Sequence, residues 1–342
     1  MIRGYATLDN TENYFNSRGI PFKNCDFFAG SEIAIGTHLG NFSDEDSNMY
    51  IDTLTLGLQN GINFIDTAVN YRGMRSEVDI GIVLKDLIST RKLLTRDEII
   101  ISTKGGQIFG DILKGIPPIK YIDDVLIKNG IIKYEDLNII DNSRFTMHPN
   151  FYEFTIEQSR KNLGVETIDI HYIHDPETSR QVLGEEVFYH QLKELIKFYE
   201  SKVDLGHIRF YGMATWDCFI SDMDSPWYIS MEKVMNIVHS VAGDNHHFKF
   251  IQLPYNKINT KAKTFKNQHV SGELYSAIDA AKELGLTVTI SSPLNQMEDL
   301  DDLNLTPKDL IEYVTSTDGV FSTMIGMKNK DHLKYNMEIF KK

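Results

Sequence analysis

The segment NFIDTAVNYRGMRSE, residues 63–77, joins a short apolar run to a polar stretch that contains glycine. The apolar run stops at a carboxylate, Asp66, and a tyrosine follows five residues later at Tyr71. A short apolar run bounded by turn residues is typical of a buried strand. The segment therefore predicts a strand whose carboxyl end delivers polar side chains into a loop.

Runs of the same kind recur along the chain, each followed by a segment in which apolar residues have helical spacing. We expect strands at Ile33–Thr37, Asn63–Asp66, Ile99–Thr103, Ile168–Ile173, Ile208–Ala214, Phe250–Leu253, Thr287–Ser291 and Val320–Ile325. Alternating strands and helices favour an α/β fold with parallel strands. A doubly wound sheet also contains such units, but eight in succession without a break in composition fit a closed barrel better. We therefore predict a (β/α)8 TIM barrel, with residues 1–342 forming one domain.

Local signals place some of the helices. Ser43 and Asp46 resemble a capping box, and Gly61 stands where a left-handed C-cap belongs. Helical spacing also links two further sets of apolar residues, Leu274, Ala277, Ile278, Ala281 and Leu284 before Gly285, and Phe188, Leu192, Leu195, Ile196 and Tyr199.

Charge and composition exclude several classes of protein. The chain has 35 basic and 48 acidic residues, a net charge of −13, and no block of lysine and arginine that would neutralise phosphates, so nucleic acid is not an expected partner. The N-terminus has no signal-peptide pattern and no stretch approaches the roughly 18 apolar residues of a membrane span, so we expect a cytoplasmic protein with no membrane contact.

The residues that often ligate metals lack the spacing of a metal site. Cys25 and Cys218 are far apart in the sequence, and His246 and His247 have no carboxylate or cysteine at ligand spacing. We expect no metal. The acidic run formed by Asp299, Asp301 and Asp302 is expected to be a solvated turn.

Polar residues end three consecutive predicted strands. Asp66 ends the second, Lys104 the third and His174 the fourth, and Tyr71 lies in the loop after the second. Each alone has a structural explanation, such as a helix cap, a loop aromatic, a solvated lysine or a core histidine. Because the carboxyl ends of barrel strands meet on one face, we expect all four side chains to converge on one rim.

These four residues permit proton donation to a carbonyl oxygen. A tyrosine has an ordinary pKa near 10 and needs a nearby cation to release its proton at neutral pH, which Lys104 supplies. Asp66 can hold the ammonium, and a neutral His174 can orient the carbonyl. Since no side chain supplies a hydride, the other half of a carbonyl reduction implies a nicotinamide cofactor.

Several phrases of the sequence, in order, resemble the aldo-keto reductase family. The resemblance covers roughly residues 30–338 and runs through GINFIDTAVNY, STK, SRKNLGVETIDIHYIHDPE, IRFYGMATW, IQLPYN, SSPL and IGMKNKDHLKYN. It implies a (β/α)8 barrel that uses NADPH, less often NADH. It also implies that Asp66, Tyr71, Lys104 and His174 are the family's catalytic tetrad, with Tyr71 as the general acid.

The resemblance further implies contacts with the cofactor, and Asp66 would be one of the residues that make them. Thr37 would contact the nicotinamide ribose, Gln252 the carboxamide, and Thr215 would offer a hydroxyl nearby. The segment Ser291, Ser292, Pro293 and Leu294 would pass the nicotinamide and pyrophosphate. Gly326, Lys328, His332 and Asn336 would bind the adenosine phosphate and the adenine.

The chain departs from the family at three cofactor positions. Ala214 and Thr215 replace a Ser-Asn pair, Ser291 replaces the aromatic ring that stacks on the nicotinamide, and Lys328 stands in for an arginine at the 2′-phosphate. A lysine offers a point charge without the bidentate fork of arginine. The sequence therefore predicts NADPH, with NADH also possible.

A long connection follows the third strand. Residues 105–150 far exceed the usual length of βα loops, and we expect this insertion to lie over the pocket as a lid or wall, the alternative being a helical pad on the side of the barrel. Trp216, Trp227 and the loop 256–270 are further rim candidates.

The predicted function is NAD(P)H-dependent reduction of an aldehyde or ketone to an alcohol, or the reverse oxidation, on a small-molecule substrate. A cofactor-sensing binding protein with little turnover is the alternative. A hydrolase or aldolase with Lys104 as nucleophile is disfavoured, because Asp66 would keep the lysine protonated.

Overall fold

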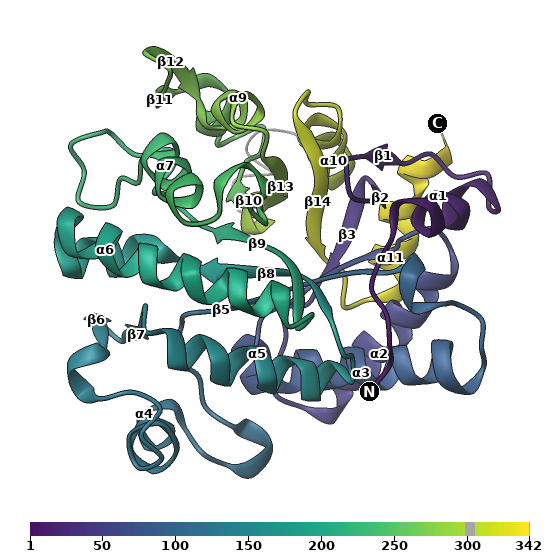
Figure 1. Cartoon of the computed structure of the whole chain (residues 1–342). Coiled ribbons are helices and arrows are strands. Elements are labelled where there is room, and N and C mark those ends of the chain that lie inside the picture. Colours follow the sequence, from purple (N-terminus) through teal and green to yellow (C-terminus); the bar gives the residue numbers. More distant parts are fainter. Residues whose placement is uncertain (298–304, 342) are drawn as a thin grey trace.

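Eight parallel strands close into a barrel in the computed structural model of the chain, which describes residues 1–297 and 305–341 (Figure 1). In order around the barrel they are β3 (Ile33–Gly36), β4 (Phe64–Asp66), β5 (Ile100–Gly105), β8 (Ile168–His174), β9 (Ile208–Ala214), β10 (Phe248–Pro254), β13 (Thr287–Ser291) and β14 (Val320–Gly326). Each corresponds to one expected strand. The predicted closed barrel is confirmed.

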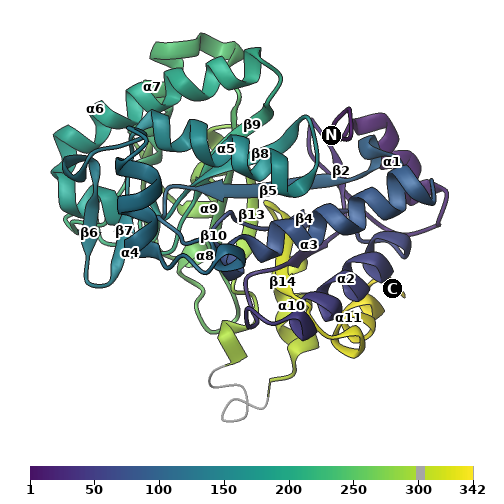
Figure 2. The ribbon, with the colours of Figure 1, turned by 90° about the horizontal axis from the view of Figure 1, so that it is seen from below.

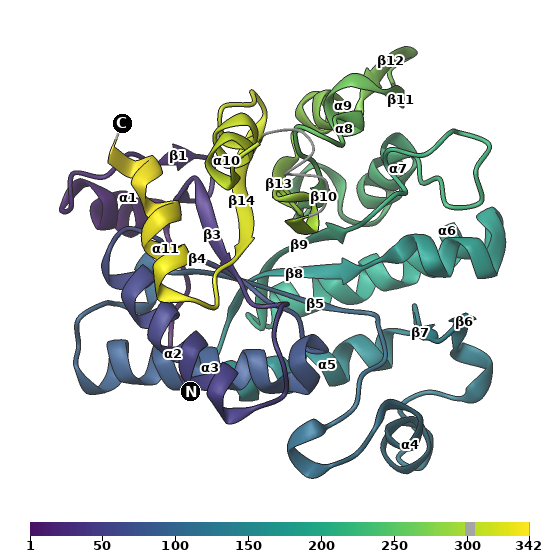
Figure 3. The same ribbon diagram turned by 180° about the vertical axis from the view of Figure 1, so that it is seen from behind.

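Helices follow the barrel strands and surround them, as Figures 1 and 3 show from opposite sides. They are α2 (Asp44–Gln59), α3 (Arg75–Leu84), α5 (Pro149–Leu163), α6 (Pro176–Asp204), α7 (Met231–Ala242), α8 (Lys261–Thr264), α9 (Ala277–Glu283), α10 (Pro307–Thr315) and α11 (Lys330–Met337). The predicted apolar face of α6, residues 188–199, is buried in the main core. Within the described residues no helix is both long and apolar enough to cross a membrane.

The predicted capping box at the start of α2 is half right. The hydroxyl of Ser43 accepts from the backbone N–H of Asp46 at 3.2 Å, as expected of an N-cap. The Asp46 carboxylate does not return to Ser43; it accepts instead from the N–H of Asn41 and from Lys328. Gly61 has a φ of +110°, the positive region that glycine tolerates, just after α2 ends.

The helix expected to begin at Leu274 begins later. Leu274 belongs to β12 (Glu273–Ser276), which pairs antiparallel with β11 (Lys266–Val270). Ser271 and Gly272 have positive φ and form the turn of this hairpin. Only after Ser276 caps the chain does α9 begin, so the helical spacing before it misled the prediction.

The amino-terminal residues close one end of the barrel. α1 (Leu8–Asn16) precedes a small hairpin of β1 (Lys23–Asn24) and β2 (Ala29–Gly30). Phe28, in this hairpin, packs on Phe210 and Phe250 near the amino ends of β9 and β10, with ring centroids 5.8 and 6.0 Å apart. The opposite end of the barrel, where the strands finish, is therefore the end that can hold a site.

The connection from β5 to α5 contains several short elements. These include α4 (Pro118–Tyr121) and a hairpin of β6 (Asn138–Ile140) and β7 (Ser143–Phe145). An apolar cluster that includes Phe109, Tyr121 and Leu126 packs on Phe151 of α5. Figures 1 and 2 show α4, β6 and β7 gathered at one side of the barrel, beside α5 and α6. The predicted acidic turn at 299–302 lies outside the described residues.

Candidate active site

The four predicted catalytic residues lie at the carboxyl ends of neighbouring strands. Asp66 is the last residue of β4, Lys104 is the last but one of β5, and His174 is the last of β8. β4 pairs with β5 and β5 with β8, all in parallel, so the three residues share one rim. Tyr71 begins a short 3₁₀ turn, Tyr71–Met74, in the loop after β4.

Asp66 and Lys104 form a buried ion pair. The Lys104 ammonium donates to Oδ2 of Asp66 at 2.6 Å and to the carbonyl of Thr67 at 2.8 Å. The second carboxylate oxygen, Oδ1, accepts from the hydroxyl of Ser102 at 2.7 Å and from the amide of Gln252 at 3.0 Å. Both carboxylate oxygens are therefore held, as a buried charge requires.

The Lys104 ammonium also faces the Tyr71 ring. Its Nζ lies 4.9 Å from the ring centroid. Burial raises the pKa of Tyr71 to about 12, although the Lys104 charge opposes that rise. Burial lowers the pKa of Lys104, but Asp66 and Tyr71 outweigh it, so the net shift is upward. Lys104 is therefore a cation and Tyr71 holds its proton at neutral pH.

The His174 ring also lies close to the Tyr71 ring. The two ring centroids are 5.8 Å apart, at an interplanar angle of 72°. Burial and the nearby Lys104 charge hold the pKa of His174 well below its usual value, so the imidazole is neutral. Its Nδ1 is buried and has no hydrogen-bond partner among the described residues.

His38 is a member of this group that the sequence did not single out. It follows Thr37 at the end of β3, and its ring lies 4.7 Å from that of Tyr71, centroid to centroid. Burial and Lys104 lower the pKa of His38. Its position directly after a barrel strand is the signal that could have identified it.

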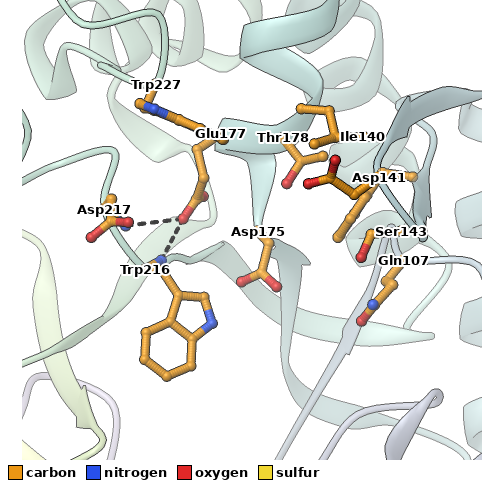
Figure 4. Close-up of a pocket in the computed structure, with 11 residues that line it drawn as sticks. Gln107, Ile140, Asp141, Ser143, Asp175, Glu177, Thr178, Trp216, Asp217 and Trp227 are labelled. Atoms are coloured by element: carbon orange, nitrogen blue, oxygen red, sulfur yellow. Dashed lines mark hydrogen bonds between the residues drawn. The ribbon is translucent and has the colours of Figure 1, made fainter.

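A cavity of about 330 Å³ opens at the start of α6 (Figure 4). Its walls come from the β6–β7 hairpin with Gln107, from the start of α6, and from the chain after β9. Asp175, which follows His174 directly, is one of the residues that line it, whereas none of the four predicted catalytic residues does. Trp216 and Trp227, both expected at the rim, also line it. The proposed role of the insertion as a lid stays a prediction.

Two carboxylates at the start of α6 were not assigned from the sequence. Asp175 has a φ of +46°, in the left-handed region, and precedes α6. Glu177 is 4% exposed, and its Oε1 accepts from the backbone N–H groups of Trp216 at 2.5 Å and Asp217 at 3.1 Å. Burial raises the pKa of Glu177 to about 7 and that of Asp175 well above its usual value.

Three of the expected nicotinamide contacts lie close to this centre. The Thr37 hydroxyl donates to that of Thr67 at 2.9 Å and to the Asp66 carbonyl at 3.3 Å. The N–H of Thr215 donates to the Gln252 carbonyl at 2.8 Å. The Gln252 amide N–H₂ contacts Asp66, as described above, and its side-chain oxygen makes no hydrogen bond within the described residues.

The expected pyrophosphate segment follows β13. Ser291 ends the strand, Ser292 has a φ of +49°, and Pro293 is buried. The Asn256 amide holds the Ser292 carbonyl at 3.0 Å. Leu294 packs against the main core.

The expected adenosine residues are less closely grouped. Gly326 ends β14, and Lys328 contacts both oxygens of Asp46, at 3.0 and 2.9 Å. His332 is exposed on α11. Asn336 is buried and lines a small cavity next to α10, away from the Lys328–Asp46 pair.

One group of possible metal ligands lies away from the rim. Glu153, Glu157 and His207 place ligand atoms within 4.8 Å of one another. Lys202 already pairs with Glu153, and Arg160 contacts Glu157 at 2.6 Å. Because cations compensate these carboxylates, the group needs no metal for its charge balance.

Comparisons with known proteins identify the family and the fold. A family model described as the aldo/keto reductase family matches residues 32–342. No curated protein sequence matches the chain. A solved structure of an aldo/keto reductase from Klebsiella pneumoniae with NADP and acetate superposes with a TM-score of 0.59 at 15% identity, over 94% of this chain and 89% of that one.

A second solved structure gives a similar result. It is the holo form of the aldo-keto reductase AKR11C1 from Bacillus halodurans, with a TM-score of 0.59 and 17% identity over 93% of this chain and 89% of that one. At such identities the likeness shows the fold.

Proposed function

The chain belongs to the aldo/keto reductase family, and on that premise we propose that it reduces an aldehyde or ketone with NADPH, or oxidises the corresponding alcohol with NADP⁺. The observation that carries the proposal is the position of Lys104. Its ammonium donates to Asp66 and lies 4.9 Å from the centre of the Tyr71 ring, and the neutral His174 ring lies 5.8 Å from that of Tyr71.

This arrangement supports proton donation by Tyr71. The phenol keeps its proton at neutral pH because its ordinary pKa is near 10 and burial raises it further. The Lys104 charge stabilises the phenolate that forms when the proton leaves. The neutral imidazole of His174 can donate an N–H to the carbonyl oxygen. The carbonyl oxygen, which becomes negative as the hydride adds to the carbon, would thus have both an acid and a hydrogen-bond donor beside it.

The residues of the chain fit a nicotinamide nucleotide. The free side-chain oxygen of Gln252 can accept from a carboxamide N–H₂, and Thr215 adds a hydroxyl beside it. Lys328 and the N-terminus of α11 provide positive charge and backbone donors for phosphate. When bound, the reduced nicotinamide supplies the hydride for the carbonyl carbon, which no side chain provides. The Klebsiella relative binds NADP and NADPH in solved structures.

Turnover with NADPH and a panel of aldehydes tests this function. We expect oxidation of NADPH by the wild type, loss of turnover in Tyr71→Phe, and unchanged NADPH binding in that variant. Tyr134→Phe is the matched control, because this tyrosine lies exposed in the insertion. Full turnover in Tyr71→Phe would contradict the role of the phenol.

A cofactor sensor remains the second candidate. Two observations favour it. Ser291 stands where the family has an aromatic ring that stacks on the nicotinamide. The amide of Gln252 already donates to Asp66, so that N–H is not free for the nucleotide. Tight NADPH binding without turnover of any aldehyde would support it. A Lys104 nucleophile is not favoured, since the raised pKa of that amine keeps it protonated.

A further inference from the structure

Four carboxyl groups line the cavity at the start of α6. Asp141, Asp175, Glu177 and Asp217 line it, and its walls include no lysine, arginine or histidine. Within the described residues none of the four forms an ion pair with lysine or arginine. The nearest approach is His174 Nε2, 3.8 Å from Asp175, and that imidazole is neutral. A ligand of this cavity therefore meets carboxyl groups with which no lysine or arginine pairs, although the Lys104 charge acts on Asp175 from a distance.

One buried carboxylate oxygen in this wall also lacks a partner. Two backbone N–H groups satisfy Oε1 of Glu177, whereas Oε2 is buried and has no hydrogen bond in the described part of the chain. A buried carboxylate oxygen without a donor is costly, and a donor delivered by a ligand would remove that cost. Figure 4 shows the Glu177 carboxyl group beside Asp217 and Trp216, facing the same space as Asp175.

Aromatic surface completes the wall. Trp216 is 43% exposed although it lies next to a buried site, and Trp227 lines the same cavity. An indole face attracts a cation, and more strongly than the other aromatic rings do. A neutral polyol would also find acceptors here, but it would leave the negative charge without compensation.

We propose that this cavity binds the ammonium group of a substrate that carries both an amine and the reacting carbonyl or alcohol. The inference rests on the proposed function, because Asp175 follows the catalytic His174 directly and places the cation beside the reacting centre. The substrate class is then an amino aldehyde, an amino ketone or the corresponding amino alcohol. Asp175 and Glu177 pair with the ammonium, and the indoles cover its alkyl chain.

Binding can be measured without turnover, because Trp216 and Trp227 are the only tryptophans of the chain. Tryptophan fluorescence therefore reports on this cavity alone. The probes are 3-amino-1-propanol and 1-butanol, which differ only in an ammonium in place of a methyl group. We expect the ammonium alcohol to bind the nucleotide-free protein about tenfold more tightly than 1-butanol near pH 7.5. Equal affinities of the wild-type protein for the two alcohols would overturn the proposal, so this test requires no variant.

Variants locate the binding site. Glu177→Gln and Asp175→Asn should each weaken binding of 3-amino-1-propanol at least about fivefold and leave 1-butanol unchanged. Glu186→Gln, an exposed carboxylate on the same helix, should change neither. Unchanged ammonium binding in both cavity variants would overturn the assignment to this cavity.

The same pair of alcohols, assayed for NADP⁺-dependent oxidation, separates this inference from the proposed function. Faster oxidation of the ammonium alcohol supports both. Selective ammonium binding that depends on Glu177 and Asp175, without oxidation of either alcohol, supports the cation site and counts against the reductase.

Discussion

The amide of Gln252 donates to Oδ1 of Asp66 across the barrel, at 3.0 Å, although the two residues are 186 positions apart in the sequence. Ser102 donates to the same oxygen at 2.7 Å. One residue expected to hold the nicotinamide is therefore joined directly to the ion pair of the proposed catalytic centre. This contact can couple occupancy of the nucleotide site to the position of Lys104.

Gln252→Met tests whether the amide acts on the nucleotide or on Asp66. We expect NADPH affinity to fall about tenfold, the loss that corresponds to one hydrogen bond of about 1–1.5 kcal/mol. A fluorescence titration with NADPH measures it. Ser102→Ala is the matched control, because it removes the other donor to the same carboxylate oxygen and should leave the affinity within about twofold. An equal loss in both variants would mean that Gln252 acts only through Asp66.

The buried pair of Lys104 and Asp66 should be costly to break from one side. Lys104→Met leaves a buried carboxylate without its cation, and we expect the free energy of unfolding to fall by about 3–5 kcal/mol. Urea denaturation measures the change. The double variant Asp66→Asn/Lys104→Met removes both charges and should recover part of the loss. If the double variant is no more stable than Lys104→Met, the unpaired charge of Asp66 is not the reason for the loss of stability.

The barrel and its tetrad were predictable from the sequence because they depend on short-range rules. β4, β5 and β8 are largely apolar runs with Asp66, Lys104 and His174 at or next to their last residue, and parallel pairing brings the carboxyl ends of these strands to one rim. The pairing of the strands therefore brings Asp66, Lys104 and His174 together, independently of the conformation of the loops. The roles of these residues in catalysis are still proposals.

The acidic cavity was not predictable in the same way. Asp175 turns with a left-handed backbone, and Glu177 is held by N–H groups of the chain after β9, about 40 residues further on. The β6–β7 hairpin that forms the other wall depends on tertiary packing of the insertion against α6. Likewise, nothing local indicates that Lys328 pairs with Asp46, 282 residues earlier.

The pair of Lys328 and Asp46 should limit the preference for NADPH. Asp46 competes with a 2′-phosphate for the same ammonium, and its pKa is held low by the Asn41 N–H and by Lys328. Asp46→Asn keeps an oxygen for the Asn41 N–H but removes the charge. We expect NADPH affinity to rise about threefold to tenfold relative to NADH, since Lys328 is then a free point charge.

Titrations with the two nucleotides side by side measure this ratio. Lys328→Met should bring it close to one in either background. If Asp46→Asn shifts NADH and NADPH equally, Lys328 does not contact the 2′-phosphate and the expected adenosine site is misplaced.

Glu177 should make the stability of the protein fall as pH rises from mildly acidic to neutral. Its carboxyl has an ordinary pKa of 4.5, and burial raises the pKa to about 7 in the folded chain. Between these values the unfolded chain has lost the proton and the folded chain keeps it, so each rise in pH favours unfolding. Above pH 7 Glu177 is ionised in both the folded and the unfolded chain. The loss in free energy of unfolding is then complete, at most about 3 kcal/mol.

Glu177→Gln isolates this effect, because the amide oxygen can still accept from Trp216 and Asp217 but the group does not titrate. We expect the variant to gain stability relative to the wild type between pH 5 and pH 8, as measured by urea denaturation at both values. Glu186→Gln, exposed on the same helix, should show no such gain. A difference between Glu177→Gln and wild type that is the same at pH 5 and pH 8 would show that Glu177 does not titrate in this range, and that the cavity is charged even in mild acid.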